Sequence, residues 1–236
     1  MIDPGKKVEI KETIQKFIDE KCLFRCNPDF EYVPKYKKGV ILGKSKDLTY
    51  QFFLRNLSHN STMVYYTSLL LLDEILLYYK LNEKEPCFQL CGLESESLPL
   101  ISAIQQNALK FNININSFTV RKKRKSYGLF NFIEGIPTEA PVIIIDDLIN
   151  SGSSCFHCLD ICKYELNLEV LTEFYSVVTL ADNPYCFKFK DDTYNINSLF
   201  VKEDFDMEYN SDKYWLPGDC DKSINKRPEY QQGILF

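Results

Sequence analysis

Four consecutive apolar residues, Val142–Ile145, constrain the fold more than any other part of the chain. An apolar run of this length without polar alternation is typical of a strand buried on both faces, and such strands occur in parallel sheets covered by helices. The flanking sequence agrees, because short apolar segments alternate with stretches of helical periodicity. The predicted strands are Cys87–Cys91, Ser117–Val120 and Val170–Leu180, and the predicted helices span about residues 97–110 and 152–166. We therefore expect an α/β domain with a parallel sheet and right-handed crossovers.

The regions on either side of this alternation differ in character. Apolar residues at helical spacing predict an amphipathic helix over residues 6–22, and residues 60–80 are too long an apolar run for a strand and predict a buried helix. Between them, Gly39–Leu42 and Leu48–Leu54 are predicted to be extended. After Pro184 the periodicity fades. The chain is thus divided into an N-terminal segment 1–37, a core 38–185 and a C-terminal extension 186–236 of unassigned role.

Composition and charge exclude several classes of protein. Of the 236 residues, 45% are hydrophobic and 26% are charged, which is a globular composition rather than a disordered or collagen-like one. The formal net charge of −5 gives no general attraction to nucleic acid or to anionic membranes. Apolar runs such as Leu69–Leu72 fall far short of the ~20 residues of a membrane span, and the charged N-terminus does not predict a secretory signal.

The nine cysteines, an odd number, are expected to be reduced thiols, and we expect a cytoplasmic protein. Cys155, Cys158 and Cys162 share one face of the predicted helix. We interpret them as small buried side chains that pack on the sheet rather than as metal ligands.

Polar side chains gather directly after the apolar strand. Asp146 and Asp147 end it, and a turn of Asn150, Ser151, Gly152, Ser153 and Ser154 leads into the next predicted helix. Ligands of α/β sheets bind beyond the carboxyl ends of the strands, and the N-terminus of a helix offers backbone N–H groups to a phosphate. Two carboxylates can hold two vicinal hydroxyls, with Mg²⁺ nearby to offset their charge. The sequence therefore predicts a site for a ribose with a 5′-phosphate; the plainer alternative is an Asp-Asp turn with a serine N-cap.

This segment resembles the binding motif for 5-phosphoribosyl 1-pyrophosphate (PRPP) in type I phosphoribosyltransferases, with Asn150 where the motif usually has Thr, Ser or a small residue. The resemblance implies an α/β fold with a mostly parallel central sheet flanked by helices, an N-terminal hood region within residues 1–37 and a C-terminal extension. It also implies that Asp146 and Asp147 bind the ribose hydroxyls and interact with Mg²⁺ only indirectly, while residues 150–154 bind the 5′-phosphate.

A run of five cations, Arg121–Lys125, follows a predicted strand. Taken alone, such a run is a solvated surface or a nucleic-acid patch. It is similar to the mobile catalytic loop of orotate phosphoribosyltransferases, Arg-Lys-x-x-Lys-x-His-Gly. The matching residues are Arg121, Lys122, Lys125 and Gly128, and Tyr127 replaces the histidine. The resemblance implies that these cations stabilise the leaving pyrophosphate, that the closed loop excludes water, and that the protein is a homodimer, because in the family this loop often acts on the neighbouring subunit's site.

The segment Cys91–Leu100 stands where the orotate enzymes have their pyrophosphate loop. The residues assigned to this loop are Gly92, Glu94, Ser95, Glu96 and Ser97. Where the orotate enzymes place lysine and glycine, this chain has Glu96 and Ser97. A carboxylate there repels pyrophosphate unless Mg²⁺ bridges the two anions or the side chain points away.

A further segment, Leu42–Arg55, resembles the region that frames the pyrimidine in the orotate enzymes. The resemblance implies that Lys44 or Lys46 serves a carboxylated base and that Phe52 or Phe53 stacks on it. The alternative is a plain β-hairpin with a lysine-rich turn.

Two functions are consistent with these features. The first is a phosphoribosyltransferase that transfers the 5-phosphoribosyl group from PRPP to a nitrogenous base, such as the pyrimidine orotate, with release of pyrophosphate and with Mg²⁺ as cofactor. The second is a non-catalytic protein of the same fold that binds a nucleotide or PRPP and contacts a partner protein through residues 186–236. It is motivated by Glu96, Tyr127 and the extension. Nucleic-acid binding through Arg121–Lys125 is compatible with the cation run but is not favoured by the net charge.

Overall fold

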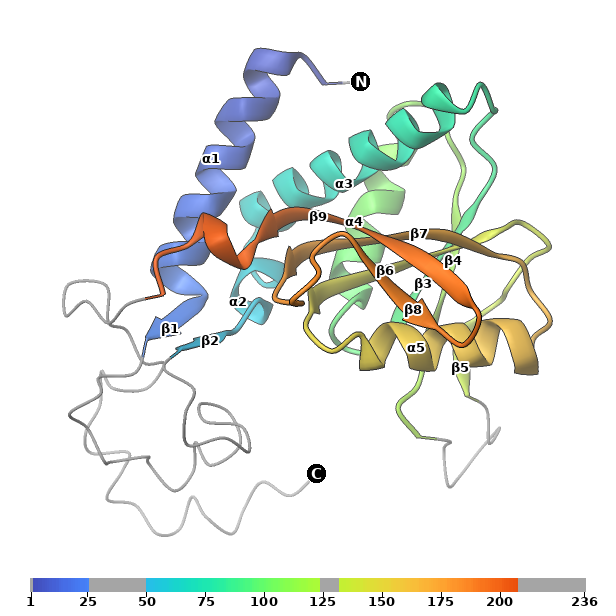
Figure 1. The fold of residues 1–236 in the computed structure, drawn as a ribbon. Coiled ribbons are helices and arrows are strands. Elements are labelled where there is room, and N and C mark those ends of the chain that lie inside the picture. Colours follow the sequence, from blue (N-terminus) through green and yellow to red (C-terminus); the bar gives the residue numbers. More distant parts are fainter. Residues whose placement is uncertain (1, 26–49, 124–131, 208–236) are drawn as a thin grey trace, which may run out of the picture.

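The structure, a computed structural model, describes residues 2–25, 50–123 and 132–207 (Figure 1). Within these ranges, no helix is both long and apolar enough to cross a membrane. The helices are α1 (Pro4–Lys21), α2 (Arg55–Ser58), α3 (Ser61–Leu81), α4 (Leu98–Leu109) and α5 (Ser153–Asp160), with a π-helical turn (Ile161–Glu165) and a 3₁₀ turn (Lys202–Asp204). The strands are β1 (Leu23–Arg25), β2 (Tyr50–Phe52), β3 (Gln89–Leu93), β4 (Asn116–Val120), β5 (Ile133–Gly135), β6 (Val142–Ile149), β7 (Val170–Thr179), β8 (Cys186–Phe189) and β9 (Asp192–Val201).

The central sheet has seven strands in the order β5-β4-β3-β6-β7-β9-β8. Its five inner strands pair in parallel, and the edge strands β5 and β8 pair antiparallel to their neighbours. The predicted mostly parallel sheet is thus confirmed, as are the helices and strands expected between residues 87 and 180. One difference is β5, a strand that the sequence does not predict and that pairs with β4. A separate antiparallel pair joins β1 to β2, with Leu23 opposite Phe52.

Helices cover both faces of the sheet (Figure 1). On one face, α3 and α4 pack over the side chains of Ile143 and Ile145, and α1 packs against α3. On the other face, α5 and the π-helical turn pack over Ile144 and Phe174. The even and odd residues of β6 therefore enter two different cores, as the period of a strand requires. This confirms the prediction that both faces of Val142–Ile145 are covered.

The two long N-terminal helices begin at side-chain caps. Asp3 accepts hydrogen bonds from the backbone N–H groups of Gly5 and Lys6 at the start of α1. Asn60 does the same for Thr62 and Met63 at the start of α3. These caps satisfy donors that the first turn of a helix leaves without an intrahelical partner.

The sheet continues beyond the predicted end of the core. Strand β9 pairs in parallel with β7 along most of its length, and β8 closes the edge, so residues 186–201 belong to the sheet rather than to an extension. Tyr194 and Ile196 of β9 are buried, while the intervening Asn195 and Asn197 donate hydrogen bonds to the carboxylate of Glu173 on β7. Such alternation of buried and polar residues is typical of a strand. The sequence does not predict this strand, because Asn195 and Asn197 interrupt the apolar pattern.

The three cysteines predicted to share one helix face do pack on the sheet. Cys155, Cys158 and Cys162 are buried against the sheet, and the sulfur of Cys162 lies 3.7 Å from that of Cys91 on β3. Burial raises the pKa of Cys91 and of Cys155 above the ordinary value, so both are held as neutral thiols. Cys87, the first residue of the predicted strand Cys87–Cys91, is exposed and precedes β3.

Candidate functional site

The chain reverses direction across the sheet between β3 and β6. From β3 it passes through α4 on one face to β4, whereas from β6 it passes through α5 on the other face to β7. The last pair in the ladder between these two strands is Cys91 opposite Ile144. Beyond this point lie the loop Glu94–Ser97 after β3 and the pair Asp146–Asp147 of β6. Open α/β sheets bind their ligands at a topological switch point, beyond the carboxyl ends of the strands, and we call the region between these two segments the crevice.

Both carboxylates of the acidic pair are buried. Asp146 and Asp147 are 5% and 8% exposed, and they lie within β6, which continues to Ile149 beside β7. Asp146 Oδ1 accepts a hydrogen bond from the backbone N–H of Asp147 at 3.0 Å, and Cys155 Sγ lies 3.9 Å from Asp146 Oδ2. Burial raises the pKa of both groups; the charge of Asp147 adds to the effect on Asp146, and the charge of Glu96 adds to the effect on both. Such carboxyls are stabilised by ligand hydroxyls or by nearby cations.

The turn after β6 begins α5 as predicted. Gly152 is the N-cap residue and has a φ of 73°, a left-handed conformation that favours glycine. A Cβ at this position would approach the ring of Phe156 to 3.2 Å. Asn150, Ser151 and Ser153 are exposed, and Ser154 is half-buried. Exposed hydroxyls around a helix N-terminus suit an anion, so the structure places all five predicted phosphate-binding residues on one turn.

The end of β3 and the loop after it pack tightly against β6. A Cβ on Gly92 would lie 2.4 Å from Ser97 Cβ and 2.7 Å from the carbonyl oxygen of Ile145, so only glycine fits there. Ser95 adopts a left-handed φ of 73°, which is uncommon for residues other than glycine. Ser97 is fully buried. The loop is therefore held at a fixed position over the crevice, and it carries Glu94 and Glu96 with it.

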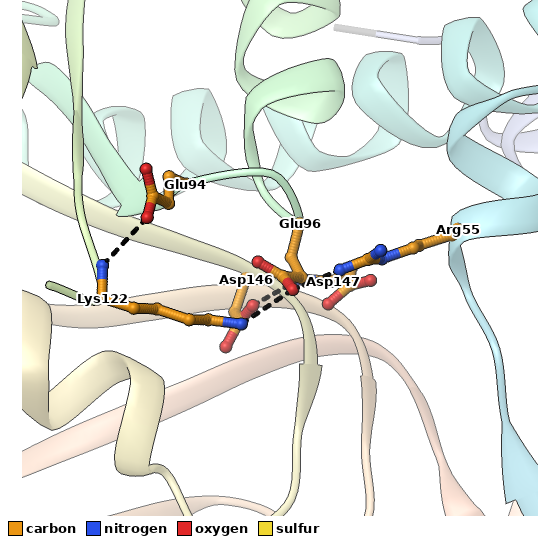
Figure 2. A network of polar contacts seen from close by, with 6 residues as sticks. All are labelled: Arg55, Glu94, Glu96, Lys122, Asp146 and Asp147. Atoms are coloured by element: carbon orange, nitrogen blue, oxygen red, sulfur yellow. Dashed lines mark hydrogen bonds and ion pairs between the residues drawn. The ribbon is translucent and has the colours of Figure 1, made fainter. Parts of the chain in front are cut away.

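Glu96 faces into the crevice between two cations. Figure 2 shows Lys122 and Arg55 reaching its carboxylate from opposite sides, with Asp146 and Asp147 beside it. Glu96 Oε1 lies 2.9 Å from Lys122 Nζ and 2.5 Å from Arg55 Nη2. Partial burial alone would raise the pKa of Glu96, but the hydrogen bonds from Lys122 and Arg55 outweigh it and hold the pKa below the ordinary value. Glu96 is thus a carboxylate, and we call Arg55, Glu96 and Lys122 the Glu96 network.

Arg121 is held away from the Glu96 network. Its Nη1 lies 2.7 Å from Glu134 Oε1 on β5 and 3.2 Å from Glu94 Oε2. Its backbone oxygen lies 2.9 Å from Nε2 of His157 on α5, and its backbone N–H donates to Phe132. In this conformation Lys122, and not Arg121, directs its charge toward the crevice. The other predicted loop residues, Lys125, Tyr127 and Gly128, lie outside the described residues.

The predicted base-binding residues are only partly placed. Lys44 and Lys46 lie outside the described residues. Phe52 is 5% exposed, and its ring lies 5.3 Å from that of Phe205. Phe52 is therefore a core residue whose ring is not available to stack on a base, and that prediction is wrong. Phe53 is half-buried, and its backbone N–H donates to the carbonyl of Cys22.

Mg²⁺ is compatible with this donor set as an indirectly held ion. Three carboxylates, from Glu96, Asp146 and Asp147, converge, and Glu96 Oε2 is a buried oxygen for which the described residues provide no hydrogen-bond partner. Oxygen ligands of this type suit a hard cation such as Mg²⁺. Within the described ranges, however, no group of three or more His, Cys, Asp or Glu side chains is arranged to hold a metal ion directly. An ion carried by a ligand's phosphates therefore fits better than a protein-bound one.

Sequence reasoning missed Arg55, Glu134 and His157 as parts of the site. Arg55 follows the aromatic pair in the segment that resembles the pyrimidine region, but its partner Glu96 is 41 residues away. The partner of Glu134 is set by the pairing of β5 with β4. Local sequence patterns carry little information on such long-range pairs.

The likeness of this chain to known proteins lies in its structure. No protein-family model and no curated protein sequence matches the chain. Among solved structures, a phosphoribosyltransferase from Corynebacterium diphtheriae matches with a TM-score of 0.57 and 16% identity, over 83% of this chain and 98% of that one. The orotate phosphoribosyltransferase of Mycobacterium tuberculosis H37Rv, solved in complex with PRPP, matches with a TM-score of 0.53 and 15% identity, over 87% and 94%. The Leishmania donovani UMP synthase matches with a TM-score of 0.55 and 21% identity, over 84% of this chain and 37% of that one.

The strand order defines an α/β protein with charged and polar side chains at a topological switch point, the position at which open α/β sheets bind ligands. Its fold is that of the type I phosphoribosyltransferases, so the resemblance predicted from the motifs is confirmed at the level of the fold.

Proposed function

We propose that this protein binds the 5-phosphoribosyl group and transfers it from PRPP to a ring nitrogen of a nitrogenous base, with release of pyrophosphate. The observation that carries the proposal is the position of Asp146–Asp147 and the turn 150–154 together at the switch point between β3 and β6. The solved structures of the same fold are phosphoribosyltransferases, and one of them is bound to PRPP. A pyrimidine such as orotate is the proposed acceptor, and a homodimer is the proposed assembly.

In the proposed reaction, the ring nitrogen forms a bond to C1 of the ribose while the bond from C1 to the pyrophosphate oxygen breaks. The electron pair of the broken bond leaves with pyrophosphate, and a proton on the attacking nitrogen is released. Asp146 and Asp147 accept hydrogen bonds from the ribose hydroxyls, which also relieves their buried charge. The backbone N–H groups and hydroxyls of residues 151–154 hold the 5′-phosphate.

Lys122 and Arg55 stabilise the negative charge that develops on the leaving pyrophosphate. Mg²⁺, carried by the phosphate oxygens, would supply further charge neutralisation when it is bound. Glu96 competes with the pyrophosphate for Lys122 and Arg55, because its carboxylate already contacts both cations.

The test is release of pyrophosphate by the full chain from PRPP and Mg²⁺ with orotate, uracil or adenine. We expect release with at least one base. A double variant, Asp146→Asn with Asp147→Asn, should reduce the rate by about 100-fold or more, because hydrogen bonds to charged groups contribute ~1.5–3 kcal/mol each. Asp191→Asn, in the exposed turn between β8 and β9, is the matched control and should retain the full rate. No release with any base would contradict the proposed transfer.

A second candidate function, binding without turnover, is favoured by the Glu96 network. A carboxylate that already neutralises Lys122 and Arg55 opposes a second anion at the same place. Such a protein would bind a nucleotide and report its presence to a partner. Calorimetry that shows binding of a nucleoside 5′-monophosphate, together with no pyrophosphate release from any base, would support this candidate over the first.

A further inference from the structure

The Glu96 network joins three segments that are distant in sequence. Glu96 comes from the loop before α4, Lys122 follows β4, and Arg55 begins α2. The side chain of Glu96 is 19% exposed, so its carboxylate is largely shielded from water, whereas Lys122 and Arg55 are about half-exposed at 56% and 48%. The cations therefore remain accessible to a ligand, while the shielded carboxylate between them already neutralises part of their charge.

The charges of the crevice do not favour a second anion. Lys122 and Arg55 supply two positive charges, and Glu96 cancels one of them. The neighbouring Asp146 and Asp147 already have raised pKa values because of burial and of the negative charges around them, including that of Glu96. A diphosphate placed against the loop Glu94–Ser97 would add more negative charge to this group, which costs free energy unless a cation comes with it.

The turn 150–154, which is suited to a monophosphate, is separated from the negative charge of Glu96. Residues 150–154 precede α5, which packs on one face of the sheet, whereas Glu96 precedes α4, which packs on the other. A 5′-phosphate at the start of α5 can therefore bind without separating Glu96 from Lys122 and Arg55. The two phosphate positions of a PRPP-like ligand thus differ in how strongly Glu96 opposes them.

We propose that Glu96 is a specificity-determining residue that occupies Lys122 and Arg55 and so makes the metal-free site select 5′-monophosphates over ligands that also carry a diphosphate on C1. The inference rests on the proposed function, because it assumes that the ribose phosphate binds at Asp146–Asp147 and the turn 150–154. It goes further in naming the group that sets the preference between two ligand classes.

The experiment compares ribose 5-phosphate with PRPP by calorimetry in metal-free buffer. The wild type is expected to bind ribose 5-phosphate more tightly than PRPP. Glu96→Gln keeps the size of the side chain and removes its charge; it should raise the affinity for PRPP about tenfold, which corresponds to ~1.4 kcal/mol, and change the affinity for ribose 5-phosphate by less than about threefold. Thermal melting verifies that the variant is folded.

Two matched variants separate charge from other effects. Glu96→Asp retains the charge, so it should keep PRPP binding weak, within about threefold of the wild type. Glu169→Gln removes one negative charge at the opposite end of the sheet, next to the start of β7, and should change neither affinity. An equal gain in PRPP affinity for Glu96→Asp and Glu96→Gln would assign the effect to loop packing and overturn the inference.

The outcomes also distinguish this inference from the proposed function. If neither ligand binds to the wild type or to Glu96→Gln, the proposed function itself is contradicted. If ribose 5-phosphate binds but the ratio of the two affinities is the same in both proteins, only the role of Glu96 is overturned. The order of the two affinities in the wild type needs no variant, so a wild type that prefers metal-free PRPP overturns the inference even if Glu96→Gln does not fold.

Discussion

Asp146 and Asp147 are buried side by side at a place where burial disfavours their charge. A protein gains no stability from such a pair, because each carboxylate is removed from water and faces other negative groups. The conflict is relieved when hydroxyl donors or a cation enter the crevice. At the scale of single residues, the buried pair therefore has a cost in the free protein, and this cost is measurable.

We predict that Asp146→Asn stabilises the free protein at pH 7 and weakens ribose 5-phosphate binding. The pKa of Asp146 is raised above its ordinary value of 3.8, so the folded state binds this proton more tightly than the unfolded state. Stability from this group is present below pH 3.8 and is lost as the pH rises through the higher folded pKa. Asparagine does not ionise, so the variant does not lose this stability as the pH rises. Its melting temperature at pH 7 should rise by about 2–4 °C for each ~1 kcal/mol gained in the free energy of unfolding.

The same variant should bind ribose 5-phosphate about tenfold more weakly, because a charged hydrogen-bond acceptor is lost. Melting curves between pH 4 and pH 8 provide the stability measurement, and the advantage of the variant should shrink toward pH 4. Asp191→Asn, at an exposed position, should leave both quantities unchanged. A variant that is less stable than the wild type at pH 7 would show that Asp146 is satisfied in the free protein.

We predict that Gly92→Ala destabilises the protein by about 1–3 kcal/mol, the usual cost of inserting atoms into a packed site. The new methyl group would meet Ser97 Cβ and the backbone oxygen of Ile145, and backbone of the central strand cannot move away at low cost. Gly5→Ala in α1 is the control, since its Cβ would meet only the Asp3 side chain at 3.3 Å. Urea denaturation measures both, and equal stability of the two variants would contradict the close approach of β3 to β6.

At the scale of elements, the β8–β9 hairpin supports the turn 150–154 from one side. The ring of Phe187 on β8 lies 4.7 Å from that of Phe156 on α5 and 5.2 Å from that of Phe174 on β7. Phe156 in turn lies against Gly152, where a Cβ would approach it to 3.2 Å. An aromatic cluster thus connects the edge of the sheet to the start of α5, and the cluster fixes the direction of the turn.

We predict that Phe187→Ala lowers the free energy of unfolding by about 2 kcal/mol, less than the ~3–5 kcal/mol of a fully buried phenylalanine because this ring is only half-buried. It should also weaken ribose 5-phosphate binding, since the turn at Gly152 loses its support. Phe111→Ala, at an exposed ring after α4, should change stability by less than about 0.5 kcal/mol. Chemical denaturation and calorimetry measure the two effects, and unchanged binding by a destabilised Phe187→Ala would separate the hairpin from the site.

The elements that the sequence predicts are those whose signal is local. Val142–Ile145 and the helix after it follow from an uninterrupted apolar run and a glycine-containing turn, and the acidic pair and the phosphate turn are adjacent to them. Strand β9 was not predicted, because Asn195 and Asn197 find their partner, Glu173, on another strand. For the same reason the contact of Arg55 with Glu96 could not be predicted, since only the folded sheet brings α2 to the loop after β3.

At the scale of the whole molecule, the candidate site depends on segments from most of the chain. The acidic pair lies on the central strand, while Arg55 comes from the N-terminal part and Phe187 from the last strands of the sheet. On its C-terminal side, the chain can be shortened without the loss of a strand of the central sheet only beyond Val201. All seven strands of the central sheet are complete at Val201, and the following residues to Met207 pack Phe205 against Phe52.

We predict that a chain ending at Met207 folds and binds ribose 5-phosphate within about threefold of the full chain. A chain ending at Tyr185 should not, because it lacks β8 and β9 and leaves the long strand β7 as an unpaired apolar edge that promotes aggregation. Circular dichroism melting, size-exclusion chromatography and calorimetry provide the comparison. A soluble, cooperatively melting chain that ends at Tyr185 would contradict the role of β9 in the sheet. Loss of ribose 5-phosphate binding in a folded chain ending at Met207 would instead assign residues 208–236 a part in the site.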